Sequence, residues 1–269
     1  MHYHRNHEPA ARAVLQQLRD GTAVLSLGVR ASRTGDIARM ASGMGYQVVW
    51  IDLEHSTMSI DCAAQIASTA TDLGMAAWVR VPEKDYAVIG RLLDGGATGI
   101  IIPKVESAEE ARLAAAACRF PPQGQRSAIA RLPQTGFVKA APMDLFRHAN
   151  DGVVLQMLLE SAKGIACADE IAAVDGVDLL GVGMNDLSAD LGCSGDMRHP
   201  ALASACASVA KAAANHGKLA VVGGVADTAH FIELVGSGFA PLVFAGIDTD
   251  ILASGLEQRS GEWRGRSFR

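Results

Sequence analysis

Charged side chains follow several short apolar runs of this sequence, at the points where the runs end. They are Asp52, Glu54, His55, Arg80, Lys104, Glu106, Glu160 and Asp186. If the runs are parallel strands of a barrel, their carboxyl ends lie on one rim, where the reactive groups of α/β barrels are found. We therefore expect these residues to form one polar site.

Glu160 and Asp186 follow the fifth and sixth of these runs. Two carboxylates from neighbouring strands can converge on one point. With waters, such a pair commonly holds Mg²⁺ or Mn²⁺, because these cations prefer oxygen ligands in an octahedron. Alternatively, each carboxylate caps the helix that follows it, and the spacing leaves both interpretations open.

Arg80 and His55 are candidates for substrate binding and proton transfer. Arg80 ends the otherwise apolar run Ala76-Ala77-Trp78-Val79. A guanidinium at such a rim suits two-point binding of a carboxylate, and the alternative is an ion pair with Asp52 or Glu54. His55 lies just past the end of a run, and its ordinary pKa near 6.5 suits a general base.

Glycine-containing turns follow the later runs. The free amides of Gly183-Met184-Asn185, just before Asp186, could bind an anion. Gly223-Gly224 and Gly246 occur where barrels that bind phosphorylated substrates often have glycine-rich turns. The alternative is a set of ordinary tight turns.

The apolar runs themselves are of strand type and alternate with segments of helical period. There are eight, at residues 23–27, 47–51, 76–81, 99–102, 152–159, 177–182, 218–222 and 241–245. Consecutive apolar residues, as in Ile100-Ile101-Ile102, are typical of strands buried on both faces of a parallel sheet. The alternation predicts a (β/α)8 TIM barrel, and the absence of GxGxxG after the first run argues against a dinucleotide-binding sheet.

Capping residues mark several helix starts. Ser107 and Glu110 have the spacing of a capping box. Asp227 and Asp248 are expected to cap the last two helices.

The chain is interpreted as one domain over residues 1–269. Residues 1–14 are expected to be an N-terminal extension. Residues 120–150 form a proline-containing insertion, which we expect beside the barrel mouth, because long loops in compact domains usually serve a site.

The composition is that of a globular protein without nucleic-acid or membrane partners. Of 269 residues, 49% are hydrophobic and 20% are charged, and the formal net charge of -5 leaves no basic excess for phosphates. No uncharged apolar run of about 18 residues occurs, so we expect no membrane span. The five cysteines form no CxxC pair, which predicts free thiols and a cytoplasmic location.

Several motifs together resemble the HpcH/HpaI aldolase family, over residues 15–257. They are Asp52-Leu53-Glu54-His55-Ser56, Arg80-Val81-Pro82, Phe120-Pro121-Pro122-Gln123-Gly124-Gln125-Arg126, Glu160-Ser161, Gly183-Met184-Asn185-Asp186-Leu187-Ser188-Ala189-Asp190-Leu191-Gly192 and Gly246-Ile247-Asp248-Thr249. The resemblance implies a barrel of the phosphoenolpyruvate/pyruvate type and a class II aldolase. Such an enzyme cleaves a 4-hydroxy-2-oxo acid reversibly to pyruvate, or another 2-oxo acid, and an aldehyde.

The resemblance also implies roles for individual residues. Glu160 and Asp186 match ligands of a divalent metal, Mg²⁺, Mn²⁺ or Co²⁺, and Arg80 matches the arginine that stabilises the pyruvate enolate. His55 matches the base, which acts through metal-bound water or directly on the aldol hydroxyl. The remaining matches are Asp52, an aspartate near that histidine; Asp94, an aspartate that pairs with it across a subunit contact; and Gly183, Met184 and Asn185 at the substrate. A homo-oligomer is implied, a hexamer with C-terminal helices exchanged between subunits.

Four departures from the family pattern leave alternatives open. Leu158 replaces a usual glutamine, Met184-Asn185 replaces Pro-Ala, and Ser127-Ala128-Ile129-Ala130-Arg131 replaces a glycine-rich segment. The fourth, Lys104-Val105-Glu106-Ser107, is similar to the citrate lyase β-subunit and malyl-CoA lyase branch. The alternatives are an acyl-CoA carbon–carbon lyase, a barrel that binds a phosphorylated sugar, and a catalytically silent binding barrel. Lys104 would be a Schiff-base candidate if no metal is used.

Overall fold

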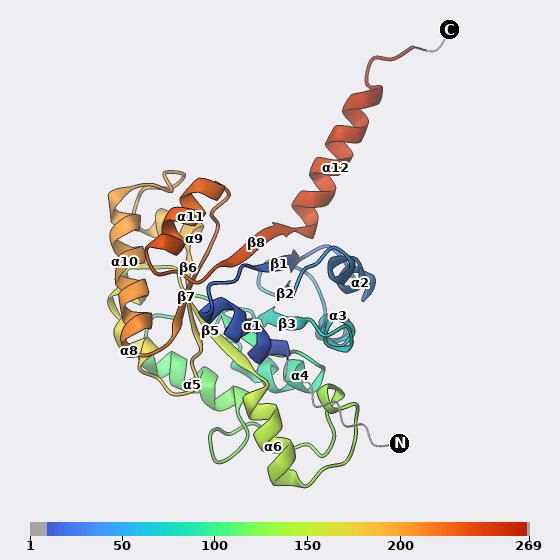
Figure 1. Cartoon of the computed structure of the whole chain (residues 1–269), viewed down its shortest axis with the longest axis vertical. Helices are drawn as coiled ribbons and strands as arrows, with labels where there is room; N and C mark the ends of the chain where they lie inside the picture. Colours follow the sequence, from blue (N-terminus) through green and yellow to red (C-terminus); the bar gives the residue numbers. More distant parts are fainter. Residues whose placement is uncertain (1–9, 268–269) are drawn as a thin grey trace.

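Eight parallel strands, with helices outside them, make up the described part of the chain. The computed structural model describes residues 10–267 (Figure 1). The strands are β1 (Val24–Val29), β2 (Val48–Asp52), β3 (Ala76–Arg80), β4 (Gly99–Ile102), β5 (Val154–Leu159), β6 (Leu179–Gly183), β7 (Leu219–Gly223) and β8 (Leu242–Ile247). Each predicted run becomes a strand, with its ends shifted by no more than two residues.

The strands pair in the order β7-β6-β5-β4-β3-β2-β1-β8, and every pair is parallel. Because β1 pairs with both β2 and β8, the sheet curls into a nearly closed barrel. The predicted TIM barrel is therefore confirmed. All carboxyl ends of the strands lie on one rim.

Helices connect the strands, and several begin at residues expected to cap them. The α-helices are α1 (Ala10–Arg19), α2 (Asp36–Gly43), α3 (Ile60–Asp72), α4 (Ile89–Asp94), α5 (Ala108–Cys118), α6 (Pro142–Asp151), α7 (Ala162–Ala166), α8 (Ala168–Ala172), α9 (Met184–Asp190), α10 (Pro200–Asn215), α11 (Thr228–Gly236) and α12 (Asp248–Trp263), with short 3-10 turns η1 (Tyr86–Val88) and η2 (Pro133–Thr135). Ser107 accepts a hydrogen bond from Glu110 N, as predicted, but the Glu110 carboxylate binds Glu106 N instead of reaching back to Ser107. Asp227 caps α11 as predicted.

Helix α1 covers the amino ends of the strands. Its apolar side chains Val14, Leu15 and Leu18 belong to the same buried cluster as Val24 and Val48 at the starts of β1 and β2. Burying such aliphatic side chains contributes about 1.5–3 kcal/mol each. The expected extension at residues 1–14 thus contains the start of this helix, and residues 1–9 lie outside the described part.

Residues 120–150 lie at the amino end of the barrel, so the expectation that they flank the mouth is wrong for a single chain. They connect α5 to β5, and a helix-to-strand connection returns to the end where the next strand begins. Phe120, Leu132 and Leu145 form a small core of their own. Gln134 Nε2 donates to the Leu93 and Ala97 carbonyls, which lie just before β4.

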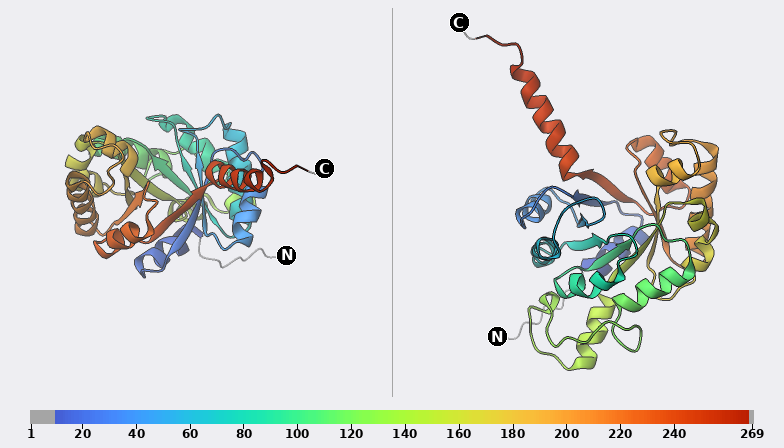
Figure 2. Two further views of the ribbon diagram at one scale, coloured as in Figure 1. Left: turned by 90° about the horizontal axis from the view of Figure 1, so that it is seen from above. Right: turned by 180° about the vertical axis from the view of Figure 1, so that it is seen from behind.

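Helix α12 projects from the barrel (Figures 1 and 2). Residues 250–263 are all exposed, including the side chains of Ile251, Leu252 and Leu256. Among the residues described, we find no helix with the length and apolar character that a membrane span requires.

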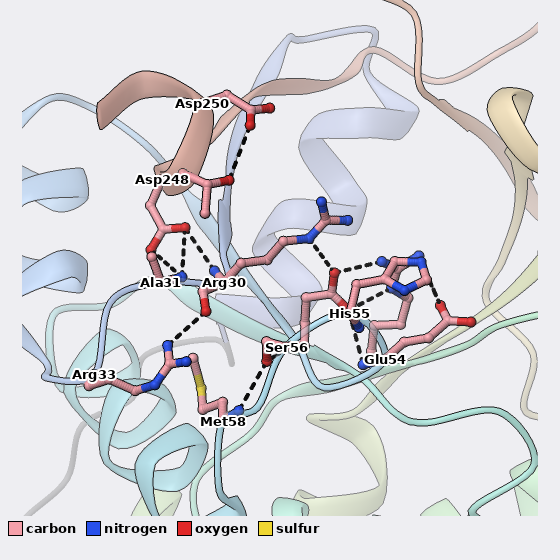
Figure 3. A network of polar contacts seen from close by, with 12 residues as sticks. Arg30, Ala31, Arg33, Glu54, His55, Ser56, Met58, Asp248 and Asp250 are labelled. Carbon is pink, nitrogen blue, oxygen red and sulfur yellow. Dashed lines mark hydrogen bonds and ion pairs between the residues drawn. The ribbon is translucent and has the colours of Figure 1, made fainter. Parts of the chain in front are cut away.

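Asp248 directly follows β8 and binds the loop that follows β1. The prediction that it caps α12 is wrong. The N-cap residue is Ile247, and no side chain caps the helix there. The buried Asp248 carboxylate instead accepts from the backbone N–H groups of Arg30 (2.8 Å), Ala31 (3.1 Å) and Ser32 (2.7 Å), which follow β1 (Figure 3). Burial alone would raise the pKa of Asp248, but these donors hold it below the ordinary value.

Replacing this carboxylate is expected to destabilise the fold. Asp248→Ala leaves three backbone donors without their acceptor, and we expect it to lower the free energy of unfolding by about 2–3 kcal/mol. Urea denaturation would measure the loss. Asp250→Ala, at an exposed position two residues further on, is the matched control. Equal stabilities of the two variants would contradict the assigned contact.

Candidate active site

The predicted site residues meet at the carboxyl rim of the barrel. Asp52 and Arg80 end β2 and β3, Glu160 follows β5 directly, and Asp186 lies in the first turn of α9, just after β6. Asp52, Arg80 and Glu160 are buried, whereas Asp186 is exposed. The barrel's parallel connectivity is what brings together residues more than one hundred positions apart.

The Asp52 carboxylate is fully buried and binds two arginines. Arg80 donates from Nε to Oδ1 at 3.0 Å and from Nη2 to Oδ2 at 2.6 Å, and Arg30 Nε donates to Oδ2 at 2.6 Å. Burial would raise the pKa of Asp52, but the hydrogen bonds and charges of these arginines outweigh it and lower the pKa. The Arg80 guanidinium also lies over the Trp50 ring, with Cζ 5.3 Å from the ring centroid. These contacts fix its plane.

Arg80 has a second carboxylate partner in Glu54, whose Oε2 lies 3.1 Å from Nη1. The ion-pair interpretation of Arg80 is therefore confirmed, with both proposed partners at once. Two of the five N–H groups of the guanidinium donate to Asp52, whereas the Nη1–Glu54 contact is an ion pair without a hydrogen bond, so both N–H groups of Nη1 and one of Nη2 are left for another ligand. Burial would lower the pKa of Arg80, but Asp52 and Glu54 raise it, so the group stays charged.

His55 is presented from a loop that Asp52 organises (Figure 3). Asp52 Oδ1 accepts from the backbone N–H groups of Glu54 (3.1 Å) and His55 (3.2 Å), and Ser56 Oγ donates to the Asp52 carbonyl. The His55 side chain is half exposed, with Nε2 3.8 Å from Glu54 Oε2. Sequence reasoning considered Glu54 only as an alternative ion-pair partner of Arg80 and missed its contact with His55.

Glu160 carries a buried carboxylate without a cationic hydrogen-bond partner. Its Oε2 accepts from the backbone N–H of Lys104 at 3.0 Å. Burial, followed by the negative charges of Asp186 and Glu54, raises its pKa to about 7, against the lowering effects of the Lys104 bond and Arg80. Gly183 packs directly against it, because a Cβ there would lie 2.6 Å from Glu160 Oε1.

This carboxylate pair fits a divalent cation. Within residues 10–267 no group of three or more His, Cys, Asp or Glu side chains is arranged for a metal ion, so any cation here has two protein carboxylates and otherwise water or substrate oxygens. Burial, together with the negative charges of Asp186 and Glu54, makes the ionised form of Glu160 unfavourable. A cation between Glu160 and Asp186 would compensate that negative charge.

The other predicted substrate-binding residues surround the start of α9. Met184 is buried, with its sulfur against Cys206, so only its backbone can reach a ligand. Asn185 is exposed and packs beside Gly224, where a Cβ would lie 3.2 Å from Asn185 Nδ2. Gly183 is the last residue of β6.

Asp94 is not brought to this rim within one chain. It ends α4, just before the amino end of β4, and its carboxylate binds Arg126 Nη2 at 2.6 Å. Its predicted pairing with a histidine requires a second subunit and stays a prediction.

Lys104 lies between the loops that follow β3 and β5. Its ammonium Nζ is 3.1 Å from Glu83 Oε2, and this pairing raises its pKa. A Schiff-base lysine needs a free amine, so the arrangement does not support that role.

The chain is a parallel α/β barrel. Its carboxyl rim carries a carboxylate pair, a buried arginine and a histidine, which is the arrangement of a barrel enzyme with an acidic site. The chain belongs to the HpcH/HpaI aldolase/citrate lyase family, whose model matches residues 30–251. The family's aldolases are carbon–carbon lyases, and so is this chain.

Individual relatives agree with that assignment. A 4-hydroxy-4-methyl-2-oxoglutarate aldolase of Hapsidospora irregularis is 35% identical over 245 residues, 90% of each chain. A 4-hydroxy-2-oxo-heptane-1,7-dioate aldolase of Salmonella arizonae is 32% identical over 222 residues, 82% of each. The crystal structure of an HpcH/HpaI aldolase from Desulfitobacterium hafniense superposes with a TM-score of 0.85 at 28% identity, covering 94% of this chain and 98% of that one. The aldolases among these relatives favour aldol chemistry over the acyl-CoA and phosphorylated-sugar alternatives.

The raised pKa of Glu160 predicts a pH-dependent stability of the metal-free chain. The pKa of Glu160 is about 7 in the folded chain, against an ordinary value of 4.5. Between pH 4.5 and 7 the folded chain therefore binds more protons than the unfolded chain, so the free energy of unfolding falls as pH rises through this range. We expect Glu160→Gln in EDTA to be more stable than wild type by about 1–3 kcal/mol at pH 8, and equally stable near pH 4.5. Thermal and urea unfolding at several pH values would measure this.

The exposed Glu109→Gln is the control, with no such pH-dependent difference. A constant difference between Glu160→Gln and wild type across this range would rule out an ionised, uncompensated Glu160.

Proposed function

We propose that this chain catalyses the reversible retro-aldol cleavage of a 4-hydroxy-2-oxo acid to pyruvate and an aldehyde or oxo acid, with a divalent cation held by Glu160 and Asp186. The buried Glu160 carboxylate, whose hydrogen bond comes from the Lys104 backbone and not from a cation, is the observation that carries the proposal. Family membership supports it. The substrates named for both relatives carry a carboxylate at each end, which makes such diacids the first to test.

The reaction must accommodate two charges as the bond between C3 and C4 breaks. An electron pair is left on C3 of the departing pyruvate and spreads to the C2 oxygen as an enolate. A proton must leave the C4 hydroxyl so that the carbonyl product can form. When bound, a divalent cation supplies Lewis-acid stabilisation of the enolate charge.

Arg80 is assigned to the enolate oxygen. Asp52 holds its guanidinium through two hydrogen bonds, and Glu54 binds from the side of Nη1. The N–H groups of Nη1 and Nη2 that do not bind Asp52 are therefore fixed in direction before substrate binds. Donors fixed in this way stabilise developing negative charge without the cost of reorganisation.

His55 is assigned to the C4 hydroxyl proton. Its half-exposed ring sits at the rim, where the departing carbonyl product has access to solvent. Glu54 Oε2 lies 3.8 Å from Nε2, so the ring nitrogen is on the side of the rim that faces the site acids.

We also propose a homo-oligomer, by family resemblance a hexamer, in which α12 packs on a partner. The exposed apolar side chains of Ile251, Leu252 and Leu256 support this, since a helix exposed on all sides gains no stability from packing on its own barrel. The five cysteines are free thiols, which supports the proposed cytoplasmic location.

The metal requirement tests the proposal. Purified protein in EDTA should release no pyruvate from 4-hydroxy-2-oxo acids, and Mg²⁺, Mn²⁺ or Co²⁺ should restore release. A coupled lactate dehydrogenase assay measures pyruvate, and malyl-CoA serves as the control substrate for the acyl-CoA alternative. Full activity in EDTA, or turnover of malyl-CoA alone, would contradict the proposed reaction.

A further inference from the structure

Lys104 has an unusual backbone conformation at the mouth of the barrel. It follows β4 by two residues, and its φ of 49° lies in the left-handed region that side chains other than glycine rarely adopt. Such conformations persist where the surrounding structure enforces them, and they cluster at functional sites. Here the Lys104 N–H is held by the buried Glu160 carboxylate, so the side chain leaves the backbone at a fixed place over the site.

The Lys104 ammonium lies above the acidic side of the rim. Nζ is 3.1 Å from Glu83 Oε2, and its charge also interacts with those of Glu54 and Glu160. These two glutamates follow β2 and β5, so the ammonium is within reach of acidic charges from both sides of the β4 loop. Glu54 is the neighbour of His55, on the side where the proposed C4 hydroxyl lies.

The negative charges of the rim carboxylates disfavour binding of a substrate that carries two carboxylates. Glu54, Glu160 and Asp186 repel a second carboxylate, and the Arg80 guanidinium is already assigned to the enolate end. Lys163 and Lys84 pair with Glu106 and Glu110. The Lys104 ammonium interacts with Glu54 and Glu160 themselves, so it is placed to offset this repulsion for a carboxylate on the acceptor half.

We propose that Lys104 binds a carboxylate on the acceptor half of the substrate and so selects 4-hydroxy-2-oxo diacids over acids with an uncharged tail. This assignment rests on the proposed function. One of the three N–H groups of the Lys104 ammonium donates to Glu83, which leaves two for a substrate. Both side chains of this pair are about half exposed, Lys104 at 46% and Glu83 at 44%. An ion pair so exposed to water is weak, so it does not prevent the ammonium from binding a substrate carboxylate.

The test compares kcat/KM for two substrates that differ in one charge, with saturating Mg²⁺. 4-Hydroxy-2-oxoglutarate carries the second carboxylate, and 4-hydroxy-2-oxopentanoate has a methyl group in its place. We expect Lys104→Met to lower the diacid-to-monoacid ratio of kcat/KM about 10- to 100-fold, mainly through KM for the diacid, and Lys104→Arg to retain most of it. Lys163→Met, which removes an exposed lysine paired with Glu106, is the matched control and should leave the ratio unchanged.

Two failures are distinguishable. A ratio in Lys104→Met equal to that of wild type would reduce the Lys104–Glu83 pair to a surface ion pair and overturn the assignment, while the proposed aldol reaction would stand. If the wild-type enzyme cleaved neither substrate with metal present, the proposed function would fall, and the assignment with it. Thermal unfolding of each variant confirms that the ratios are measured on folded protein.

Discussion

The buried carboxylate of Asp52 organises the catalytic rim more than any other group. It receives two hydrogen bonds from Arg80, one from Arg30 and two from the loop that carries Glu54 and His55. Removing one partner from a buried pair typically costs about 3–5 kcal/mol, because the other charge is left without compensation. The orientations of the arginine and the histidine loop therefore depend on one carboxylate at the end of β2.

Charge is distributed unevenly between the two sides of the site. On the β2–β3 side, Asp52 and Arg80 neutralise one another and their pKa values move in the directions that keep both charged. On the β5–β6 side, burial and then the negative charges of Asp186 and Glu54 raise the pKa of Glu160. A divalent cation held by Glu160 and Asp186 would compensate this second side and would supply Lewis-acid stabilisation of the enolate. The proposed chemistry uses both sides at once.

The strands and the placement of the site could be predicted from the sequence because both follow from local patterns. Runs such as Ile100-Ile101-Ile102 identify buried parallel strands, and parallel strands bring Glu160 and Asp186 to one rim. Side-chain contacts between segments that are distant in the sequence produce no local pattern of this kind. The binding of Asp248 to the Arg30 backbone, and of Arg30 to Asp52, could not be read from spacing.

Two expectations show why the rest could not be predicted in this way. Asp248 lies at the start of a helix, so its type suggested a cap, but its carboxylate binds three distant backbone N–H groups instead. The insertion at residues 120–150 was assigned by its length alone, whereas its position between α5 and β5 determines that it lies at the amino end. In both cases the three-dimensional arrangement of the elements, and not the local sequence pattern, determined the outcome.

Exchange of the pyruvate methyl protons in D₂O, followed by proton NMR with Mg²⁺, tests the division of labour between Arg80 and His55 most directly. Arg80→Lys keeps the positive charge beside Asp52 but loses the planar donors, so both exchange and aldol cleavage should fall about 10²–10³-fold. His55→Ala should slow cleavage by about 10²–10⁴-fold and reduce exchange far less. Exchange at the wild-type rate in Arg80→Lys would contradict the assignment of the enolate to this arginine.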